Sequence, residues 1–558
     1  MVNKMYLVLA LFLSGTLGTA GGADLTLNPG VSGSYVVNAV IDRIRSKCIL
    51  GDDRLFLRRL AYVETNDGKD SKTYRSGYDG GIWQVDKSKF LMTKTCPSSI
   101  AAECSIVQSA FNIDWRSTSW ADLRKPLYSG LAAALYIKEN QSNSPPGDVA
   151  SQASFWASKL RPGGSQSGFI TKARAMKGID CRTQLDLTFI LDGSGSVSRR
   201  DFQRMIEFVK AVVTKLDISK DAVKIAVVEY ASKVGDDIKF QDHTTKSSLL
   251  KAIGRISKSN GGTNTSAAIL HTFNVLLSSA AGARANAKRV AILLTDGKSN
   301  DKPATISAAA KAKAAGITMI SVGIGNADET ELRGVATHPS CTHVIMLNSF
   351  KEIDSLLYQL KDSSCGASTA VEEGHPINKP LPENGTVEET FVTNEGNLTS
   401  PDENKAVIVK VVCGTLEMYS SYNTPRPGPA FYDVRHSVTD GRPGIMHFNE
   451  TMKGRPLYIT VIGTRLTIQQ VASCINASYS IDINQPPTDT FNNVTNPCSP
   501  GDTCDYAHPS DTTKFIHCDT KGNMFVTQCP GQTQYDPDTV SCGSIAIEGG
   551  KACQICQP

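Results

Sequence analysis

The pattern of apolar and polar positions divides the chain into parts with different periods. Apolar residues recur with the spacing of amphipathic helices at 38–63, 127–139 and 150–160, while 77–85 has the composition of a turn followed by a strand. The first part of the chain is therefore predicted to be mainly α-helical.

The pattern changes at about residue 185. From there to 325, short apolar runs typical of buried strands alternate with helix-length segments. Strands separated by helices favour a parallel sheet with crossover helices, so this region is predicted to be an α/β doubly wound domain. The predicted strands are 185–191, 223–230, 289–294 and 317–324.

The remainder of the chain has a β-type pattern. Residues 366–385 are rich in Pro, Glu, Gly and Asn without periodicity, and are predicted to be a linker. Alternating apolar positions at 389–483 predict a small β-sandwich, with Cys413 and Cys474 available for an internal disulfide. From Cys498 onward there are seven cysteines in 61 residues. Because this tail has too few apolar residues for a core, it is predicted to depend on disulfides.

The N-terminus has the order of a cleavable secretory signal, with an apolar run at 6–13 and small residues ending at Ala20 or Ala23. This order predicts a secreted protein. No later stretch approaches the roughly 18 apolar residues that a membrane span needs. The expected organisation is a signal peptide at 1–23, an α-rich module at 24–181, an α/β domain at 182–365, a linker at 366–388, a glycosylated β-rich module at 389–486 and a disulfide-stapled module at 487–558.

Cysteine number and charge limit the partners. Outside the cell the 15 cysteines should mostly form disulfides, and their odd number leaves at least one thiol unpaired or bonded to another chain. A net charge of +4 gives no reason to expect nucleic acid. Five of the seven N-x-S/T sequons begin between 384 and 495, which predicts an exposed, glycosylated stretch. A further sequon begins at Asn264.

Three loops of the α/β region carry oxygen ligands. The strand at 185–191 runs directly into an Asp-x-Ser-x-Ser motif, and such loops lie where parallel sheets bind their ligands. Two carboxylates with hydroxyl groups are hard donors that suit Mg²⁺, Mn²⁺ or Ca²⁺ rather than zinc, and they leave room for an acidic group of a partner. The alternative is glycine turns with serine caps. The candidate ligands are Asp192, Ser194, Ser196, Thr263 and Asp296.

The three loops have the motifs Asp-Gly-Ser-Gly-Ser at 192–196, Gly-Gly-Thr-Asn-Thr at 261–265 and Thr-Asp-Gly at 295–297. In this order and spacing they resemble the von Willebrand factor A family over about residues 182–365. The resemblance implies a metal-ion-dependent adhesion site, in which Asp192, Ser194 and Ser196 coordinate directly or through water. It further implies that Thr263 joins in an open state and that Asp296 acts mostly through water. A disulfide between the flanking Cys181 and Cys365 is also implied.

The tail from Cys504 to Cys553 resembles a peritrophin-A-type chitin-binding domain, through the runs 504–509, 514–518, 529–531 and 535–537. The resemblance implies that aromatic rings stack on N-acetylglucosamine, and the candidates are Phe515, Phe525 and Tyr535. For Phe525 and Tyr535 a place in the small core is an equal alternative. The family's second cysteine is missing near Thr512 or Thr513, so Cys553 needs another partner, and Cys498 or Cys556 could serve.

A third resemblance covers about residues 30–180. A helix-like run at 57–65 contains Glu64, and Gly77 opens a turn that ends in Gln84-Val85-Asp86. Together these two motifs resemble goose-type lysozymes and lytic transglycosylases. The resemblance implies that Glu64 is the catalytic acid and that Asp86 lines the cleft, with Asp79 or Asp70 as weaker candidates for the base.

The alternative to a catalytic role is that Glu64 is a solvated helix-end residue in a module that binds sugar without cleaving it. Two functions therefore compete. One is a structural matrix protein, of mollusc shell or cuticle, that binds chitin through its tail and an acidic protein through its metal site. The other is a glycoside hydrolase of peptidoglycan or chitin. A recognition protein of innate immunity that only binds is a third hypothesis.

Overall fold

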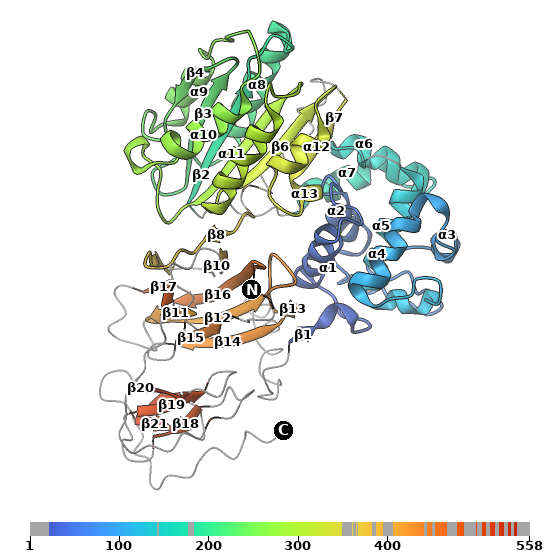
Figure 1. The fold of residues 1–558 in the computed structure, drawn as a ribbon. Helices are drawn as coiled ribbons and strands as arrows, with labels where there is room; N and C mark the ends of the chain where they lie inside the picture. The colour runs from blue at the N-terminus through green and yellow to red at the C-terminus, as the bar shows by residue number, and fades with distance from the viewer. Residues whose placement is uncertain are drawn as a thin grey trace. The chain divides into compact units, whose positions relative to one another are not determined.

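The computed structural model describes 22–141, 144–176, 184–348, 360, 364, 366–381, 387–393, 405–439, 443–448, 452, 454–465, 477–484, 498, 505–508, 514–518, 524–528, 534–536 and 541–543. These residues belong to two compact units, shown in Figure 1. One consists of Asp24–Ala370 with Thr424–Arg426, and the other of the rest of the chain. The first contains a helical module followed by an α/β domain, and the second contains a β-sandwich and a small tail module.

The helical module is built around α5, most of whose residues are buried, which makes it the central helix. The predicted helical region 38–63 is two helices, α1 and α2, because Cys48, Arg54 and Leu55 adopt positive φ angles between them. The helices are α1 (Ser34–Ser46), α2 (Phe56–Thr65), α3 (Lys87–Lys94), α4 (Ala101–Phe111), α5 (Pro126–Asn140), α6 (Val149–Phe155) with its π-helical continuation Trp156–Leu160, and α7 (Gln166–Ala175).

The strand expected within 77–85 is wrong, since this stretch forms turns. Gly81 lies there at a φ of 62°, and a Cβ at this position would come within 2.0 Å of the Leu123 carbonyl oxygen. The chain therefore passes the neighbouring backbone too closely for a side chain. Trp83 is buried on the adjoining turn, and its indole donates to the Leu57 carbonyl at 2.9 Å.

The α/β domain contains a six-stranded sheet in the order β4-β3-β2-β5-β6-β7. All neighbouring strands are parallel except β4, which is antiparallel to β3. The four predicted strands are present, and the edge strands β4 and β7 were not predicted. The strands are β2 (Leu185–Asp192), β3 (Val223–Tyr230), β4 (Val234–Ile238), β5 (Lys288–Thr295), β6 (Thr318–Ile324) and β7 (Val344–Leu347).

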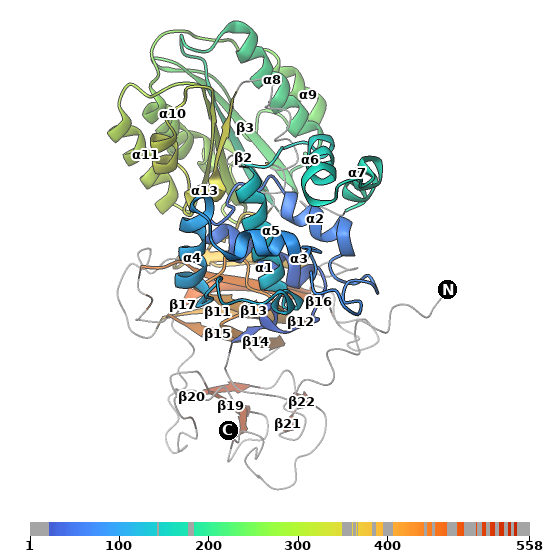
Figure 2. The ribbon, with the colours of Figure 1, turned by 90° about the vertical axis from the view of Figure 1, so that its right-hand side faces the viewer.

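Helices cover both faces of this sheet, as Figure 2 shows with α8 and α9 on one side and α10 and α11 on the other. Burial from two faces explains why the central strands are apolar without alternation. A mostly parallel sheet with helices on both faces confirms the prediction of an α/β doubly wound domain. The helices are α8 (Arg199–Thr214), α9 (Lys246–Ile253), α10 (Thr265–His271), α11 (Lys302–Ala314), α12 (Glu329–Val335) and α13 (Ser340–His343).

The β-sandwich has a five-stranded sheet, β14-β12-β16-β10-β8, and a four-stranded sheet, β15-β11-β17-β9. The prediction of a linker at 366–388 is corrected, because this stretch supplies β8, β9 and the start of β10 to these sheets. Its polar sequence suits short edge strands, which only pairing with neighbours makes visible. The strands are β8 (Thr369–Ala370), β9 (Ile377–Pro380), β10 (Val387–Thr393), β11 (Ala406–Val412), β12 (Gly414–Ser421), β14 (Val434–Thr439), β15 (Gly444–His447), β16 (Leu457–Arg465) and β17 (Ser478–Asn484).

A charged pair lies inside the sandwich. The Lys379 ammonium is 2.6 Å from a Glu389 carboxylate oxygen that also accepts a hydrogen bond from the Tyr479 hydroxyl at 2.9 Å. All three side chains are buried. Burial, together with the Glu389 charge, holds the pKa of Tyr479 well above its ordinary value. Cys413 is disulfide-bonded, while the partner expected for it, Cys474, lies outside the described residues.

The tail module contains a three-stranded antiparallel sheet of β18 (Asp505–Ala507), β19 (Lys514–Cys518) and β20 (Met524–Gln528). A hairpin of β21 (Gln534–Asp536) and β22 (Ser541–Gly543) follows. Cys498 is bonded to Cys518, with their Cα atoms 5.4 Å apart. Cys498 is therefore not the partner that Cys553 requires, which corrects one of the two pairings considered.

Candidate functional site

The metal-ligand candidates meet where the chain order of the sheet reverses. From the central strand β2 the chain goes to β3 on one side and later to β5 on the other. Asp192 ends β2, and Asp296 directly follows β5. The carboxyl ends of adjacent parallel strands flank the crevice in which such sheets bind ligands. The sheet order thus brings together two carboxylates that are 104 positions apart in the chain.

A chain of hydrogen bonds joins the side chains of the first and third loops. The hydroxyl oxygens of Ser194 and Ser196 are 3.0 Å apart, and the Ser196 hydroxyl donates to Asp296 at 2.7 Å. Asp192 accepts from the Ser194 backbone amide at 2.9 Å. Hydrogen bonds therefore connect four of the five predicted ligands, which are Asp192, Ser194, Ser196 and Asp296.

The fifth candidate, Thr263, lies on the neighbouring loop. That loop is held to the first by two backbone hydrogen bonds, from Gly195 to the Gly261 carbonyl and from Asn260 to the Gly193 carbonyl, both at 2.9 Å. Thr263 is mostly buried. No described hydrogen bond joins its side chain to the other candidates, so the role of Thr263 as a ligand stays a prediction.

Gly193, at the centre of the motif, lies against the side chain of Glu229. A Cβ on Gly193 would lie 1.7 Å from a carboxylate oxygen of Glu229, so no other residue fits there without movement. The Glu229 carboxylate accepts from the backbone amide and the hydroxyl of Ser259, at 2.9 and 2.7 Å. Burial raises the pKa of Glu229, although these hydrogen bonds oppose the rise. Glu229, on β3, thus packs against the loop that contains Gly193 and is hydrogen-bonded to Ser259.

Three residues at this site were not found from the sequence. The Thr295 hydroxyl donates to Asp192 at 2.6 Å. The Lys258 ammonium lies 3.1 and 2.8 Å from the Gly193 and Ser194 carbonyls. The Asn300 side-chain oxygen accepts from the Thr263 amide at 3.1 Å. Thr295 immediately precedes the Asp296 motif, so its position offered a signal, whereas Lys258 and Asn300 offered none.

The donor set fits a hard dication. Among the described residues, no group of three or more His, Cys, Asp or Glu is placed to hold a metal. A metal at this site therefore depends on the serine and threonine hydroxyls as well as on Asp192 and Asp296. Burial raises the pKa of Asp296, and the negative charge of Asp192 raises it further. The hydrogen bond from Ser196 opposes this rise without reversing it. Two carboxylates that repel each other are relieved by a cation between them.

The Asn264 side chain, which belongs to a sequon, has a structural role. The Asn264 side-chain oxygen caps α10 by accepting from the Ala267 amide at 3.2 Å and from the Ser266 hydroxyl at 3.0 Å. The residue is half-buried.

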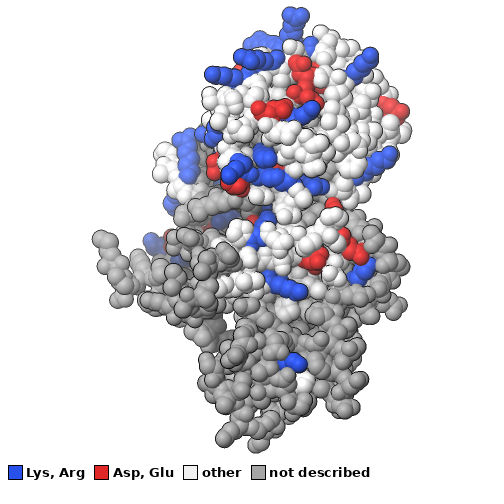
Figure 3. Space-filling view, turned by 90° about the vertical axis from the view of Figure 1, so that its left-hand side faces the viewer, with Lys and Arg blue, Asp and Glu red and all other residues white. Residues whose placement is uncertain are grey.

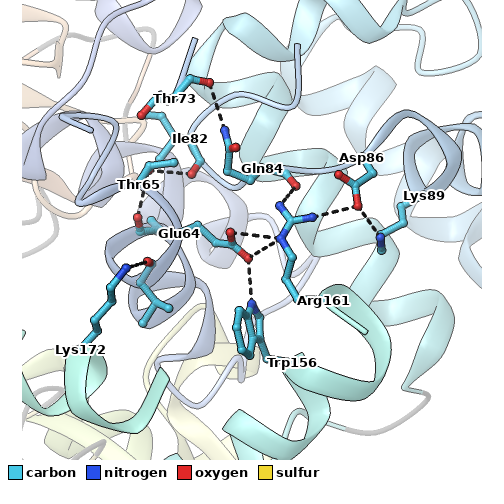
Figure 4. A network of polar contacts seen from close by, with 12 residues as sticks. Glu64, Thr65, Thr73, Ile82, Gln84, Asp86, Lys89, Trp156, Arg161 and Lys172 are labelled. Atoms are coloured by element: carbon cyan, nitrogen blue, oxygen red, sulfur yellow. Dashed lines mark hydrogen bonds and ion pairs between the residues drawn. The ribbon is translucent and has the colours of Figure 1, made fainter. Parts of the chain in front are cut away.

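A second candidate site surrounds Glu64 near the end of α2. Figure 4 shows Trp156 and Arg161 directed at its carboxylate. The Trp156 indole donates at 2.8 Å, and the Arg161 guanidinium is 3.2 Å away. Another nitrogen of Arg161 lies 2.8 Å from Asp86. One guanidinium therefore joins the predicted acid to the predicted turn aspartate, and Glu64 is not a solvated helix-end residue.

Glu64 and Asp86 have opposite pKa shifts. Burial raises the pKa of Glu64, and the Arg161 charge and the Trp156 hydrogen bond oppose this without reversing it. Burial also acts on Asp86, but hydrogen bonds from Lys89 and Tyr78 and the charge of Arg161 lower its pKa. The surroundings of the two carboxyl groups thus shift their pKa values in opposite directions.

The weaker candidates have described side-chain partners other than Glu64. Asp79 forms an ion pair with Arg124 at 3.2 Å. Asp70 is exposed and accepts from the Lys72 backbone amide at 2.8 Å, as a turn residue does. Neither is linked to Glu64 by a described contact.

In the tail, the structure corrects one chitin-binding candidate. Phe515 is only 1% exposed, so its ring has no free face for a sugar. The side chains of Phe525 and Tyr535 lie outside the described residues. The expected Cys181–Cys365 bridge also falls on residues outside the description.

Comparison with known proteins agrees with the α/β domain. The family model of the von Willebrand factor type A domain matches residues 186–359. Matrilin-1 of Gallus gallus is 34% identical over 202 residues, which are 36% of this chain and 41% of that protein. Human matrilin-3 is 34% identical over 38% of this chain and 44% of its own length. The chain thus spans less than half the length of the matrilins that it matches.

Solved structures give matches of similar extent. Proximal thread matrix protein 1 from the mussel byssus is 29% identical, covers 35% of this chain and 53% of its own, and has a TM-score of 0.32. One structure of that protein has a zinc-occupied metal-ion-dependent adhesion site. Manganese-loaded TRAP protein of Plasmodium vivax is 19% identical, covers 40% of this chain and 91% of its own, and has a TM-score of 0.29.

The described part of the chain has no helix that is long and apolar enough to cross a membrane. Its disulfides agree with export, because such bonds persist in oxidising compartments. The chain is a secreted multidomain protein of the extracellular matrix type that carries a von Willebrand factor type A domain and resembles the matrilins over that domain.

Proposed function

We propose that this protein links components of an extracellular matrix. Its A domain, residues 182–365, would bind an acidic group of another matrix protein through Mg²⁺, Mn²⁺ or Ca²⁺. Asp192, Ser194, Ser196, Thr263 and Asp296 would hold the metal. The tail would bind chitin or another N-acetylhexosamine polymer, in shell, cuticle or a comparable matrix.

One observation carries the metal-dependent part: hydrogen bonds connect the hydroxyls of Ser194 and Ser196 to Asp296, while Thr295 orients Asp192. The ligands are thus gathered before a metal arrives, which lowers the cost of ordering them. When bound, the cation supplies an electrophilic centre for a carboxylate. The protein's own part is to hold the oxygens and leave room for that carboxylate.

Metal binding is tested by thermal unfolding of the secreted protein with Mg²⁺, Mn²⁺, Ca²⁺ and Zn²⁺ in turn. Zinc is included because the byssus relative accepts it. We expect a higher Tm with the favoured ion and no shift in Asp192→Ala. Asp201→Ala is the matched control, since Asp201 lies in the first turn of α8 near the site, accepts from the Ser198 hydroxyl and is not a ligand candidate. An equal shift in both variants would rule out this metal site.

Chitin binding is tested by retention on chitin beads. Phe525→Ala and Tyr535→Ala should reduce retention, with EDTA leaving it unchanged. Phe515→Ala should instead unfold the tail, because the ring is buried. Retention that is unchanged in both of the first two variants would exclude ring stacking by these residues. A reducing against a non-reducing gel tests the possible intermolecular disulfide.

A second candidate function is hydrolysis of a β-1,4-linked N-acetylhexosamine polymer by the helical module. The opposite pKa shifts of Glu64 and Asp86 favour it. Glu64 would protonate the leaving oxygen, and Arg161 would position the carboxylates. Incubation with chitin oligomers and bacterial cell wall is the test. Glu64→Gln should abolish cleavage. Asp114→Asn, at an exposed position of the same module, should retain it, and equal activity in wild type and Glu64→Gln would end the enzymatic proposal.

A further inference from the structure

The face of the A domain that carries α8 and α9 has a shallow basic groove. Its volume is about 680 Å³. Figure 3 shows Lys and Arg side chains gathered along the upper left margin of the view. The groove is lined by Lys210, Lys246, Ser247, Leu250, Lys251, Gly254 and Arg255.

The positive charge of this face is not balanced locally. Residues 199–215 have five Lys or Arg and two acidic residues, and 246–255 have three Lys or Arg and none. The two acids, Asp201 and Glu207, each pair with a cation one turn along α8. No ion pair joins Lys246, Lys251 or Arg255 to a carboxylate in the described structure. The groove therefore concentrates positive potential along its length.

The lining indicates the chemistry of the partner. Leu250 is the one large apolar side chain among the lining residues, and Gly254 has no side chain. An acidic peptide gains affinity mainly by burying aromatic or aliphatic anchors in pockets, and this open groove offers them Leu250 and the methylene groups of its lysines. A polymer with repeated permanent negative charges needs only cations in a row and an open path.

We propose that this groove binds a linear sulfated polysaccharide, independently of the metal site. Sulfate esters stay ionised at any pH of the matrix, and Arg255 and the lysines donate to their oxygens. Lys258 is not part of the groove, because its ammonium is bound to the Gly193 and Ser194 carbonyls. The groove and the metal site thus involve different basic side chains. Polysaccharide binding by the groove goes beyond the proposed function.

The test measures binding of the full secreted chain to heparin, used as the sulfated probe. In about 0.15 M NaCl we expect saturable binding that weakens steeply as salt rises. Lys251→Gln with Arg255→Gln should lower the affinity about tenfold or more. The matched control is Lys220→Gln with Lys311→Gln, which removes the same charge elsewhere on the domain and should change affinity less than about twofold.

The remaining outcomes separate this inference from the metal site. EDTA and Asp192→Ala should leave heparin binding intact, even if metal-dependent adhesion fails. Equal losses in the two double variants would overturn the groove as a site and leave only net charge. Tighter binding of polyglutamate than of heparin would overturn the polysaccharide in favour of an acidic protein.

Discussion

A disulfide bond joins Cys48, which follows α1, to Cys341 in α13, 293 positions later in the chain. Beside it, the Arg54 guanidinium donates to the Met346 carbonyl at 3.1 Å. A Cβ on Gly51 would lie 2.5 Å from the Cys341 carbonyl oxygen, so the two segments are in close contact. The helical module and the A domain are thus covalently linked at a point far from their chain connection.

This bond predicts that the two modules remain together after the chain between them is cut. A protease site placed within 177–180 separates Cys48 from every cysteine of the A domain. After cleavage, we expect one band on a non-reducing gel and two on a reducing gel. Cys48→Ser with Cys341→Ser should give two bands in both. Two bands from the cleaved wild type without reductant would contradict the bond. Its loss should also cost about 2–4 kcal/mol of stability.

Thr295 is predicted to tune metal affinity without binding the metal. Its hydroxyl donates to Asp192 and accepts from the Gly297 amide at 3.2 Å, so Thr295→Val removes both hydrogen bonds and keeps the shape. Loss of such a supporting contact typically weakens a metal site by about 10–100-fold. Calorimetric titration with Mn²⁺ measures the effect.

The matched control for Thr295 is Thr188→Val on β2. Thr188 is buried, and its hydroxyl has no hydrogen-bond partner in the described structure. Thr188→Val should therefore leave metal affinity unchanged and should not destabilise the domain. A similar loss of affinity in both variants would mean that the effect comes from the sheet and not from orientation of Asp192.

Glu64 predicts a pH dependence of stability. Burial raises the pKa of Glu64 in the folded protein, so ionising Glu64 costs more in the folded than in the unfolded state. Its contribution is most favourable below the ordinary pKa and is lost as the pH rises through the raised one. Glu64→Gln removes this dependence. Urea midpoints from about pH 4 to about pH 7 should fall more steeply for wild type than for Glu64→Gln. Parallel curves would contradict the raised pKa.

The buried pair in the sandwich predicts a large loss when only one partner is changed. Lys379→Met leaves the Glu389 carboxylate buried with the Tyr479 hydroxyl as its remaining described donor. We expect a cost of about 3–5 kcal/mol in chemical unfolding. Lys379→Met with Glu389→Leu should recover most of it. A double variant as unstable as the single one would show that packing volume, and not the uncompensated charge, is responsible.

Local pattern was sufficient for part of the fold. The run from 185 to Asp192 is apolar because it is buried on both faces, and the same run places the first metal ligands at its end. The strands of the linker region could not be found in this way. Ile377 and Lys379 lie on an edge strand whose identity depends on pairing with β17, which is about 100 residues away.

The sequence by itself was enough to name candidate metal ligands, a candidate acid and a secretory signal. These predictions follow from side-chain chemistry and short spacings. Tertiary structure alone decided which of them meet. It placed Asp296 against Ser196, brought Arg161 between Glu64 and Asp86, buried Phe515 and paired Cys48 with Cys341. Each of these relations depends on distance in space between residues far apart in the chain, which periodicity and motif spacing do not contain.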